Sequence, residues 1–354
     1  MDTEREHYPA LDGLRAYAAM AVLAYHTTIA CFWLGWVGVH FFFVLSGFLI
    51  TGILLKSKEA GNYFKVFYAR RFLRIFPIYY LVLFSVLALA AIGGRNIQSA
   101  GYYIFYIQNF KLAFHNWDIN TFPRWLNHTW TLAIEEQFYI FFPLLVRFLK
   151  EKALVIACFI LIALSVFTRY YLSLKLPDNT INWGNTVSNL DFLSAGALLA
   201  IGIRRIEPEK IIRVLWIAFA LFVVAFWLLT HKPFSGPIYL TNLHGQFFFI
   251  GLLLFAAITV LGLVINKARV LQLLFENKAA VYVGKISYGL YLYHYPFFLL
   301  TDHYCRQWGI KNVFVVVALK FIGSVVVAAL SFRFFESRIL KWKAHFKYNL
   351  TPNP

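Results

Sequence analysis

The chain has 354 residues, of which 60% are hydrophobic and 14% are charged, and its formal net charge is +17. Soluble domains are about half apolar and about a quarter charged, so this composition excludes an ordinary soluble enzyme. The apolar residues cluster in runs of roughly 18–22, which is the length of a helix that spans a bilayer. These runs predict an all-α, polytopic membrane protein whose basic charge lies in its loops and not at a nucleic-acid interface.

We expect a transmembrane helical bundle of about ten spans that forms one domain over residues 1–354. The predicted spans are residues 14–32, 37–55, 75–93, 130–148, 153–172, 189–203, 212–230, 244–265, 286–302 and 313–333, and a basic cytoplasmic tail follows over 334–354. With these spans, 24 of the 33 Lys and Arg residues fall in loops on one side of the membrane and 8 fall on the other. Because cytoplasmic loops are enriched in basic residues, both termini are predicted to be cytoplasmic.

The first predicted span carries two ionisable residues, Arg15 and His26. Eleven residues of helix return the chain to nearly the same face about 16 Å further along the axis. Ionisable groups inside a membrane usually face the bundle interior or a wet cavity, so this pair indicates a buried site for an anionic reactant. The simpler alternative is a snorkelling arginine and a structural histidine.

The second and third predicted spans add small residues and a basic cluster. Ser46 and Gly47 permit close approach of a neighbouring helix. Arg71 and Arg74 are three residues apart, so they share one helix face at the cytoplasmic start of the third span. Guanidinium groups bind phosphate through paired hydrogen bonds, which favours a phosphorylated cytosolic donor at this place. The alternative is that both arginines only anchor the helix at the membrane surface.

Residues 97–114 are rich in aromatic side chains but also contain polar residues, including Gln108, Asn109 and Lys111. If this segment spanned the membrane, every later loop would change sides and the charge bias would be lost. We therefore predict an interfacial or re-entrant helix on the outer side, because aromatic side chains favour the headgroup region.

The fourth predicted span contains two adjacent carboxylates, Glu135 and Glu136. A carboxylate inside a membrane is costly, so at least one should pair with a cation or a histidine. Neighbouring residues on a helix are about 100° apart, so the two side chains are expected to face different directions. A purely structural ion pair is the alternative to a role in catalysis.

The ninth predicted span places His294 two residues before Pro296. A proline in a helix leaves one backbone carbonyl free and bends the helix, often beside a cavity. The alternative is a packing histidine whose hydrogen bonds are satisfied. The three cysteines show no metal-ligand spacing, and neither a nucleotide-binding glycine loop nor a zinc-protease or serine-hydrolase motif is found, so no metal is expected.

Taken together, these motifs resemble those of the acyltransferase-3 family of membrane acyltransferases, which includes bacterial polysaccharide O-acetylases. The resemblance runs from residue 8 to about 336. The matching motifs are Tyr8–Arg15, the pair Arg15 and His26, Ser46–Phe48, the pair Arg71 and Arg74, Trp130–Tyr139, and Ser287–Pro296.

The resemblance implies transfer of an acyl group, usually acetyl, from cytosolic acyl-coenzyme A to a hydroxyl of a glycan or glycolipid beyond the outer face of the bacterial inner membrane. His26 is expected to act as a general base or to carry the acyl group itself. Glu135 would orient the imidazole, and Arg15 would bind the donor or stabilise the site electrostatically. The expected donor-binding residues are Arg15, Arg71 and Arg74, and the expected substrate-binding residues are Ser46, Trp130, Tyr139 and His294. Because the chain ends after the tenth predicted span, we expect a stand-alone form without a periplasmic hydrolase-like domain.

A transporter or flippase for an anionic substrate is the alternative function, because it would also need ionisable groups inside the membrane. Transporters often contain inverted repeats with broken helices in matching halves. The sequence shows no such internal symmetry, so the acyltransferase is favoured. The acceptor, the acyl chain and the oligomeric state are not indicated by the sequence.

Overall fold

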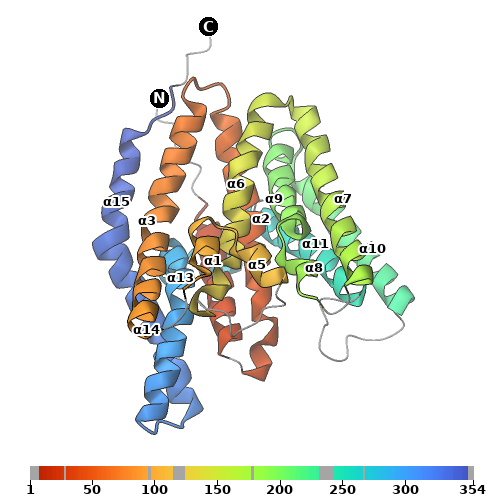
Figure 1. The fold of residues 1–354 in the computed structure, drawn as a ribbon. Coiled ribbons are helices and arrows are strands. Elements are labelled where there is room, and N and C mark those ends of the chain that lie inside the picture. The colour runs from red at the N-terminus through yellow and green to blue at the C-terminus, as the bar shows by residue number, and fades with distance from the viewer. Residues whose placement is uncertain are drawn as a thin grey trace.

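The structure is a computed structural model that describes residues 8–27, 29–94, 97–114, 124–176, 179–230, 243–265 and 268–349. Within these ranges every regular element is a helix, and the long helices lie side by side in a bundle (Figure 1). Each predicted span overlaps one of the long helices. These are α1 (Pro9–His26), α2 (Gly38–Lys56), α3 (Tyr63–Ile92), α6 (Trp130–Phe148), α7 (Glu151–Lys175), α9 (Leu190–Gly202), α10 (Pro208–Thr230), α11 (Leu243–Ile265), α13 (Lys278–Gln307) and α14 (Val313–Ser331).

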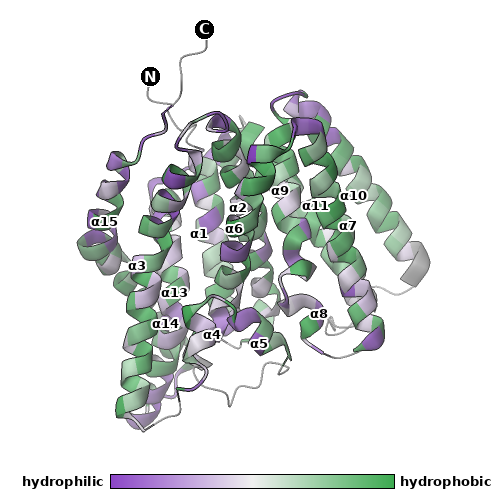
Figure 2. Cartoon of the chain, turned by 45° about the horizontal axis from the view of Figure 1, so that its top comes forward, coloured by the Kyte–Doolittle hydropathy of each residue, from purple (hydrophilic) through white to green (hydrophobic). Residues whose placement is uncertain are grey.

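The outer helices present apolar faces to their surroundings. Phe159 and Leu174 of α7 and Trp216 and Trp227 of α10 are at least half exposed, and Figure 2 shows the hydrophobic colour along both helices. In the described residues, six helical segments are long and apolar enough to cross a membrane, so the chain is an integral membrane protein, while the count of ten spans stays a prediction. The six segments are Ala30–Lys56, Tyr63–Ile92, Glu151–Lys175, Pro208–Trp227, Phe247–Ile265 and Val313–His345.

The first span differs from its predicted bounds of 14–32. Helix α1 ends at His26, and residues Ala30–Val37 form a 3₁₀ helix, η1, before α2 begins. This segment folds back against α1, because a Cβ atom at Gly35 would lie 2.1 Å from the backbone oxygen of Ala21. The apolar composition of η1 is that of a membrane span. The segment nevertheless runs back along α1, and Gly35 allows the close contact between them.

Residues 97–114 form two short helices, α4 (Ala100–Ile104) and α5 (Gln108–Phe114). Neither approaches the roughly 20 residues needed to cross a bilayer. The polar side chains are buried: the amide of Gln108 donates to the backbone oxygen of Thr129 at 2.9 Å, and that of Asn109 donates to the hydroxyl of Thr186 at 2.9 Å. The segment therefore packs against the bundle through hydrogen bonds, and its side of the membrane stays a prediction.

The last span continues beyond its predicted end at residue 333. After α14 the chain makes a π-helical turn over Phe332–Glu336 and then forms α15 (Ser337–Lys341) and a short 3₁₀ helix over Trp342–His345. The predicted tail of 334–354 thus begins inside a helical segment, and its last residues, 350–354, lie outside the described residues. Backbone oxygens of the tail accept hydrogen bonds from Arg70 at 2.7 Å and Asn62 at 2.9 Å, which attaches it to the start of α3.

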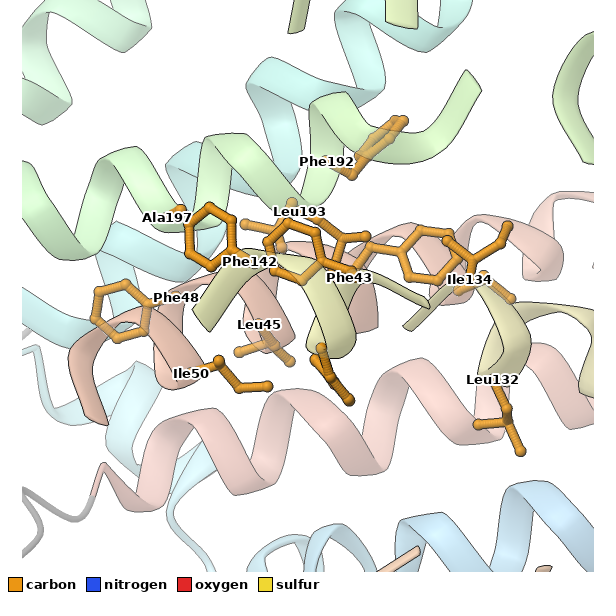
Figure 3. Packing of buried hydrophobic residues seen from close by; sticks show 14 of the residues in the cluster. Phe43, Leu45, Phe48, Ile50, Leu132, Ile134, Phe142, Phe192, Leu193 and Ala197 are labelled. Atoms are coloured by element: carbon orange, nitrogen blue, oxygen red, sulfur yellow. The ribbon is translucent and has the colours of Figure 1, made fainter. Parts of the chain in front are cut away.

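Helices α2 and α9 approach each other closely in the core. A Cβ atom at Gly47 would lie 1.9 Å from the backbone oxygen of Leu193, and one at Gly196 would lie 2.1 Å from that of Val44. The prediction that Gly47 allows close approach is confirmed. Figure 3 shows the apolar side chains that fill the space around this contact, among them Phe43 and Phe142.

A buried ion pair joins α7 to α9. The guanidinium of Arg169 lies 2.6 Å from the carboxylate of Asp191, and their side chains are 1% and 0% exposed. The hydroxyl of Ser165 donates to the same carboxylate at 3.0 Å, and the ring of Phe249 from α11 lies 5.0 Å from the guanidinium. Both terminal nitrogens of the Arg169 guanidinium have hydrogen-bond partners, so the charge is paired inside the protein, as a charge inside a membrane must be.

We expect Asp191→Asn to lower the free energy of unfolding by about 3–5 kcal/mol, because it leaves the Arg169 guanidinium buried without a counter-charge. Thermal unfolding of the purified protein in detergent measures the loss. The matched control is Glu151→Gln, which breaks the 2.7 Å pair with the largely exposed Arg205 and should leave the midpoint nearly unchanged. Equal effects of the two substitutions would contradict the assigned importance of the buried pair.

Reporters fused at either terminus should be active in the cytoplasm, and a reporter inserted after residue 115 should be active outside it. The reason is the asymmetry of basic residues between alternate loops. The insertion point lies outside the described residues. A cytoplasmic signal at residue 115 would show that the topology assigned to residues 97–114 is wrong.

Candidate active site

A cavity opens among α1, α2, α3, α6 and α13. Six of the nine residues singled out from the sequence line it. They are Arg15, Ser46, Arg71, Arg74, Glu135 and Tyr139. The remaining three, His26, Trp130 and His294, do not line this cavity.

Both carboxylates of α6 face this cavity, together with Arg71. The hydroxyl of Ser46 donates to the carboxylate of Glu135, which also interacts electrostatically with Arg71 and Arg15. Glu136 interacts electrostatically with Arg71 as well. The two side chains are about 100° apart on the helix, and both line one cavity. The expectation of a cationic partner is met by both.

The three arginines at the cavity lie beside different groups. Arg15 donates to the carboxylate of Asp12 at 2.9 Å, and the Arg71 guanidinium lies 4.8 Å from the ring centroid of Tyr139. Arg74 lines both this cavity and a smaller one that it shares with Glu336. The cavity lining carries three guanidinium groups and two carboxylates, so it retains one positive charge in excess when all are ionised.

A second cluster holds three histidines that come from distant parts of the chain. The Nε2 atom of His294 lies 3.1 Å from Nδ1 of His26, and the ring of His128 packs 4.9 Å from that of His294. His128 and His294 are buried, whereas His26 is partly exposed. In the part of the chain that the structure describes, no group of three or more His, Cys, Asp or Glu side chains is arranged to hold a metal ion.

Pro296 explains how His128 is attached to α13. Proline has no N–H group, so the carbonyl four residues earlier, that of Leu292, has no helical donor. The Nε2 atom of His128 lies 3.2 Å from this oxygen and donates to it. The sequence predicted a freed carbonyl but not its partner, because nothing in the local sequence around His128 distinguishes it from an ordinary polar residue before a span.

The histidine cluster lies directly behind one wall of the cavity, which is formed by Tyr291. This tyrosine lines the cavity, and its ring lies 5.4 Å from the ring of His128 and 5.6 Å from that of His294. Its hydroxyl donates to the backbone oxygen of His128 at 2.6 Å and accepts from Thr131 at 2.7 Å. A basic cavity and an imidazole cluster are thus neighbours separated by one side chain.

Two of the predicted site residues, Glu135 and His26, are not in contact. Glu135 is bound by Ser46 in the cavity, whereas the ring of His26 contacts the backbone of Val22, the ring of His294 and two tyrosine rings. The structure therefore does not bring Glu135 to His26. Trp130 packs against Trp183, with ring centroids 5.3 Å apart, and so forms part of the core.

Comparison with known proteins assigns the chain to a family. The acyltransferase-3 family, described as an acyltransferase domain, matches residues 8–333. The peptidoglycan O-acetyltransferase OatA of Listeria monocytogenes is 33% identical over 95% of this chain and 56% of its own length. The O-acetyltransferase OatA of Staphylococcus aureus is 29% identical over 95% of this chain and 57% of its own length. No solved structure gives a significant match.

The chain therefore spans about half the length of the curated relatives that it matches. These relatives are bacterial, and the apolar helices identify the chain as an integral protein of the bacterial cytoplasmic membrane.

Proposed function

Because the chain belongs to the acyltransferase-3 family, we propose that it transfers an acetyl group from cytosolic acetyl-coenzyme A to a hydroxyl of a glycan at the outer face of the membrane. The observation that carries this proposal is the position of the basic cavity directly beside the His26 cluster. The names of the relatives support acetyl as the acyl group and peptidoglycan as the class of acceptor.

The basic cavity suits the donor. Coenzyme A carries several phosphate groups, and Arg15, Arg71 and Arg74 offer guanidinium donors that match phosphate geometry. Glu135 and Glu136 hold Arg71 in place when the donor is not bound. Ser46 and Tyr139 complete the polar lining, so they are proposed to contact the donor through the cavity.

His26 is proposed as the general base. The acceptor oxygen attacks the thioester carbon while its proton passes to His26; the carbon–sulfur bond then breaks, and the sulfur of coenzyme A takes the proton. A neutral imidazole suits both transfers near neutral pH. The second route, through an acyl group on His26, requires two successive displacements and would give ping-pong kinetics.

A transporter is not supported by the site. Carriers that alternate access need a substrate site between two repeats that move against each other. Here the ionisable groups form a basic cavity and a neighbouring histidine cluster, and the family is one of acyltransferases.

His26→Ala should abolish acetyl transfer while coenzyme A binding stays largely intact, because it removes the proposed base and leaves the basic cavity untouched. The measurement is mass-spectrometric detection of acetyl ester on a peptidoglycan fragment, with the protein in liposomes supplied with acetyl-coenzyme A. His303→Ala is the matched control, since this exposed histidine lies on α13 outside both sites. Normal turnover of the His26 variant would remove His26 from the mechanism, and no transfer by the unmodified protein would refute the proposed function.

Replacing Arg71 and Arg74 with Gln should weaken donor binding by about tenfold or more. A hydrogen bond to a charged group contributes about 1.5–3 kcal/mol, and each 1.4 kcal/mol is a factor of about ten in the dissociation constant. Calorimetric titration with coenzyme A measures this change. Arg70→Gln is the control, because Arg70 bonds to the backbone of Phe346 and does not line the cavity. An unchanged dissociation constant in the double variant would place the donor elsewhere.

A further inference from the structure

We propose that His294 is a positioning residue that, together with the backbone oxygen of Val22, holds His26 in the one neutral tautomer whose Nε2 atom is free to accept a proton. The inference rests on the proposed function, in which His26 is the base. It concerns a separate property, namely which ring nitrogen of His26 carries hydrogen, and this property is measurable whether or not the protein transfers an acyl group.

The tautomer of His294 follows from its first partner. Its Nδ1 atom lies 2.6 Å from the backbone oxygen of Tyr291. A carbonyl oxygen only accepts hydrogen bonds, so Nδ1 carries the hydrogen. A neutral imidazole has one hydrogen on its two nitrogens, so Nε2 of His294 presents a lone pair. The side chain is 0% exposed, and its orientation is fixed by packing on all sides.

The tautomer of His26 follows in turn. Its Nδ1 atom faces two acceptors, the backbone oxygen of Val22 at 2.9 Å and the lone pair on Nε2 of His294 at 3.1 Å. A hydrogen on Nδ1 satisfies both acceptors, whereas a lone pair there would face two others at close range. Nδ1 therefore carries the hydrogen, and Nε2, for which the structure describes no partner, is left as the basic atom of a partly exposed ring.

The same contact stabilises His26 during the reaction. When Nε2 of His26 takes the acceptor proton, the ring becomes an imidazolium, and its Nδ1–H donates a charge-assisted hydrogen bond to His294. In a serine protease a carboxylate has this orienting role. Here a neutral imidazole serves instead, which avoids the cost of a second charged group inside the membrane.

His294 has no remaining nitrogen with which to bind substrate. Both ring nitrogens are occupied, one by Tyr291 and one by His26. The role expected from the sequence, a hydrogen bond to the acceptor or to the thioester, would require His294 to give up one of these contacts. A positioning role keeps both contacts throughout the reaction.

The direct test is nitrogen-15 NMR of the full chain, labelled at histidine and embedded in lipid bilayers. Protonated and unprotonated ring nitrogens have separate chemical shifts, and the signals of His26 are identified as those lost in His26→Gln. We expect a protonated Nδ1 and an unprotonated Nε2 in the unsubstituted protein. A hydrogen on Nε2 of His26 would overturn the proposal. This measurement is made on the unsubstituted protein, so it does not depend on whether a His294 variant folds.

Two variants of His294 supply a matched pair. Glutamine carries an amide oxygen that reaches the position of Nε2, whereas asparagine reaches only the position of Nδ1. His294→Asn should leave Val22 as the remaining described acceptor for Nδ1 of His26, so that the Nε2-protonated tautomer gains population. We expect kcat to fall by about 10-fold to 100-fold, within the range of general-base catalysis, with the donor KM changed less than about twofold. His294→Gln should restore the tautomer and most of kcat.

A lower kcat with an unchanged His26 tautomer in His294→Asn would overturn the positioning role and assign His294 to the substrate. A wild-type tautomer together with wild-type kcat would overturn it as well. If the unsubstituted protein transfers no acetyl group but its His26 carries hydrogen on Nδ1, the proposed function fails while the structural inference stands.

Discussion

Every charged or hydrogen-bonding group within this bundle must find its partner inside the protein, because the surrounding lipid offers none. The positions of the helices follow from that requirement. Arg169 and Asp191 join α7 to α9, and Lys320 of α14 pairs with Asp302 of α13 at 2.8 Å. Around the cavity the same requirement brings α1, α3 and α6 together through Arg15, Arg71 and the two adjacent glutamates.

The groups of the site differ from these structural ion pairs in being accessible. Arg169 and Asp191 are paired with each other and inaccessible, so their role is to stabilise the fold. The arginines of the cavity instead line open space, and His26 keeps one ring nitrogen without a described partner on a partly exposed side chain. Access to a cavity or to the surface is what distinguishes these reactive groups from the buried structural ones.

Much of this arrangement is predictable from the sequence, because runs of apolar residues and isolated charges are strong signals in a membrane protein. The long helices and the six cavity residues were found in this way. Boundaries were less predictable: η1 has the composition of a span, and only the contact of Gly35 with α1 reveals that it folds back. The separation of Glu135 from His26 could not be predicted either. Periodicity shows which face of a helix a residue occupies, but not which residue of another helix lies at the same depth in the membrane.

His128 shows the remaining limit. Its partner, the carbonyl of Leu292, is 164 residues away in the chain and is free only because of Pro296. A pattern confined to one helix cannot reveal a bond between two, so the third histidine emerges only from the assembled fold.

That distance has a consequence for biosynthesis. His26 is made well before His294, from which 268 residues separate it. A chain that is still being inserted into the bilayer therefore contains His26 with Val22 of its own helix, but without its second partner. Under the proposed role of His294, the base is fully positioned only when α13 is complete, so a nascent or truncated chain lacks a fully positioned base.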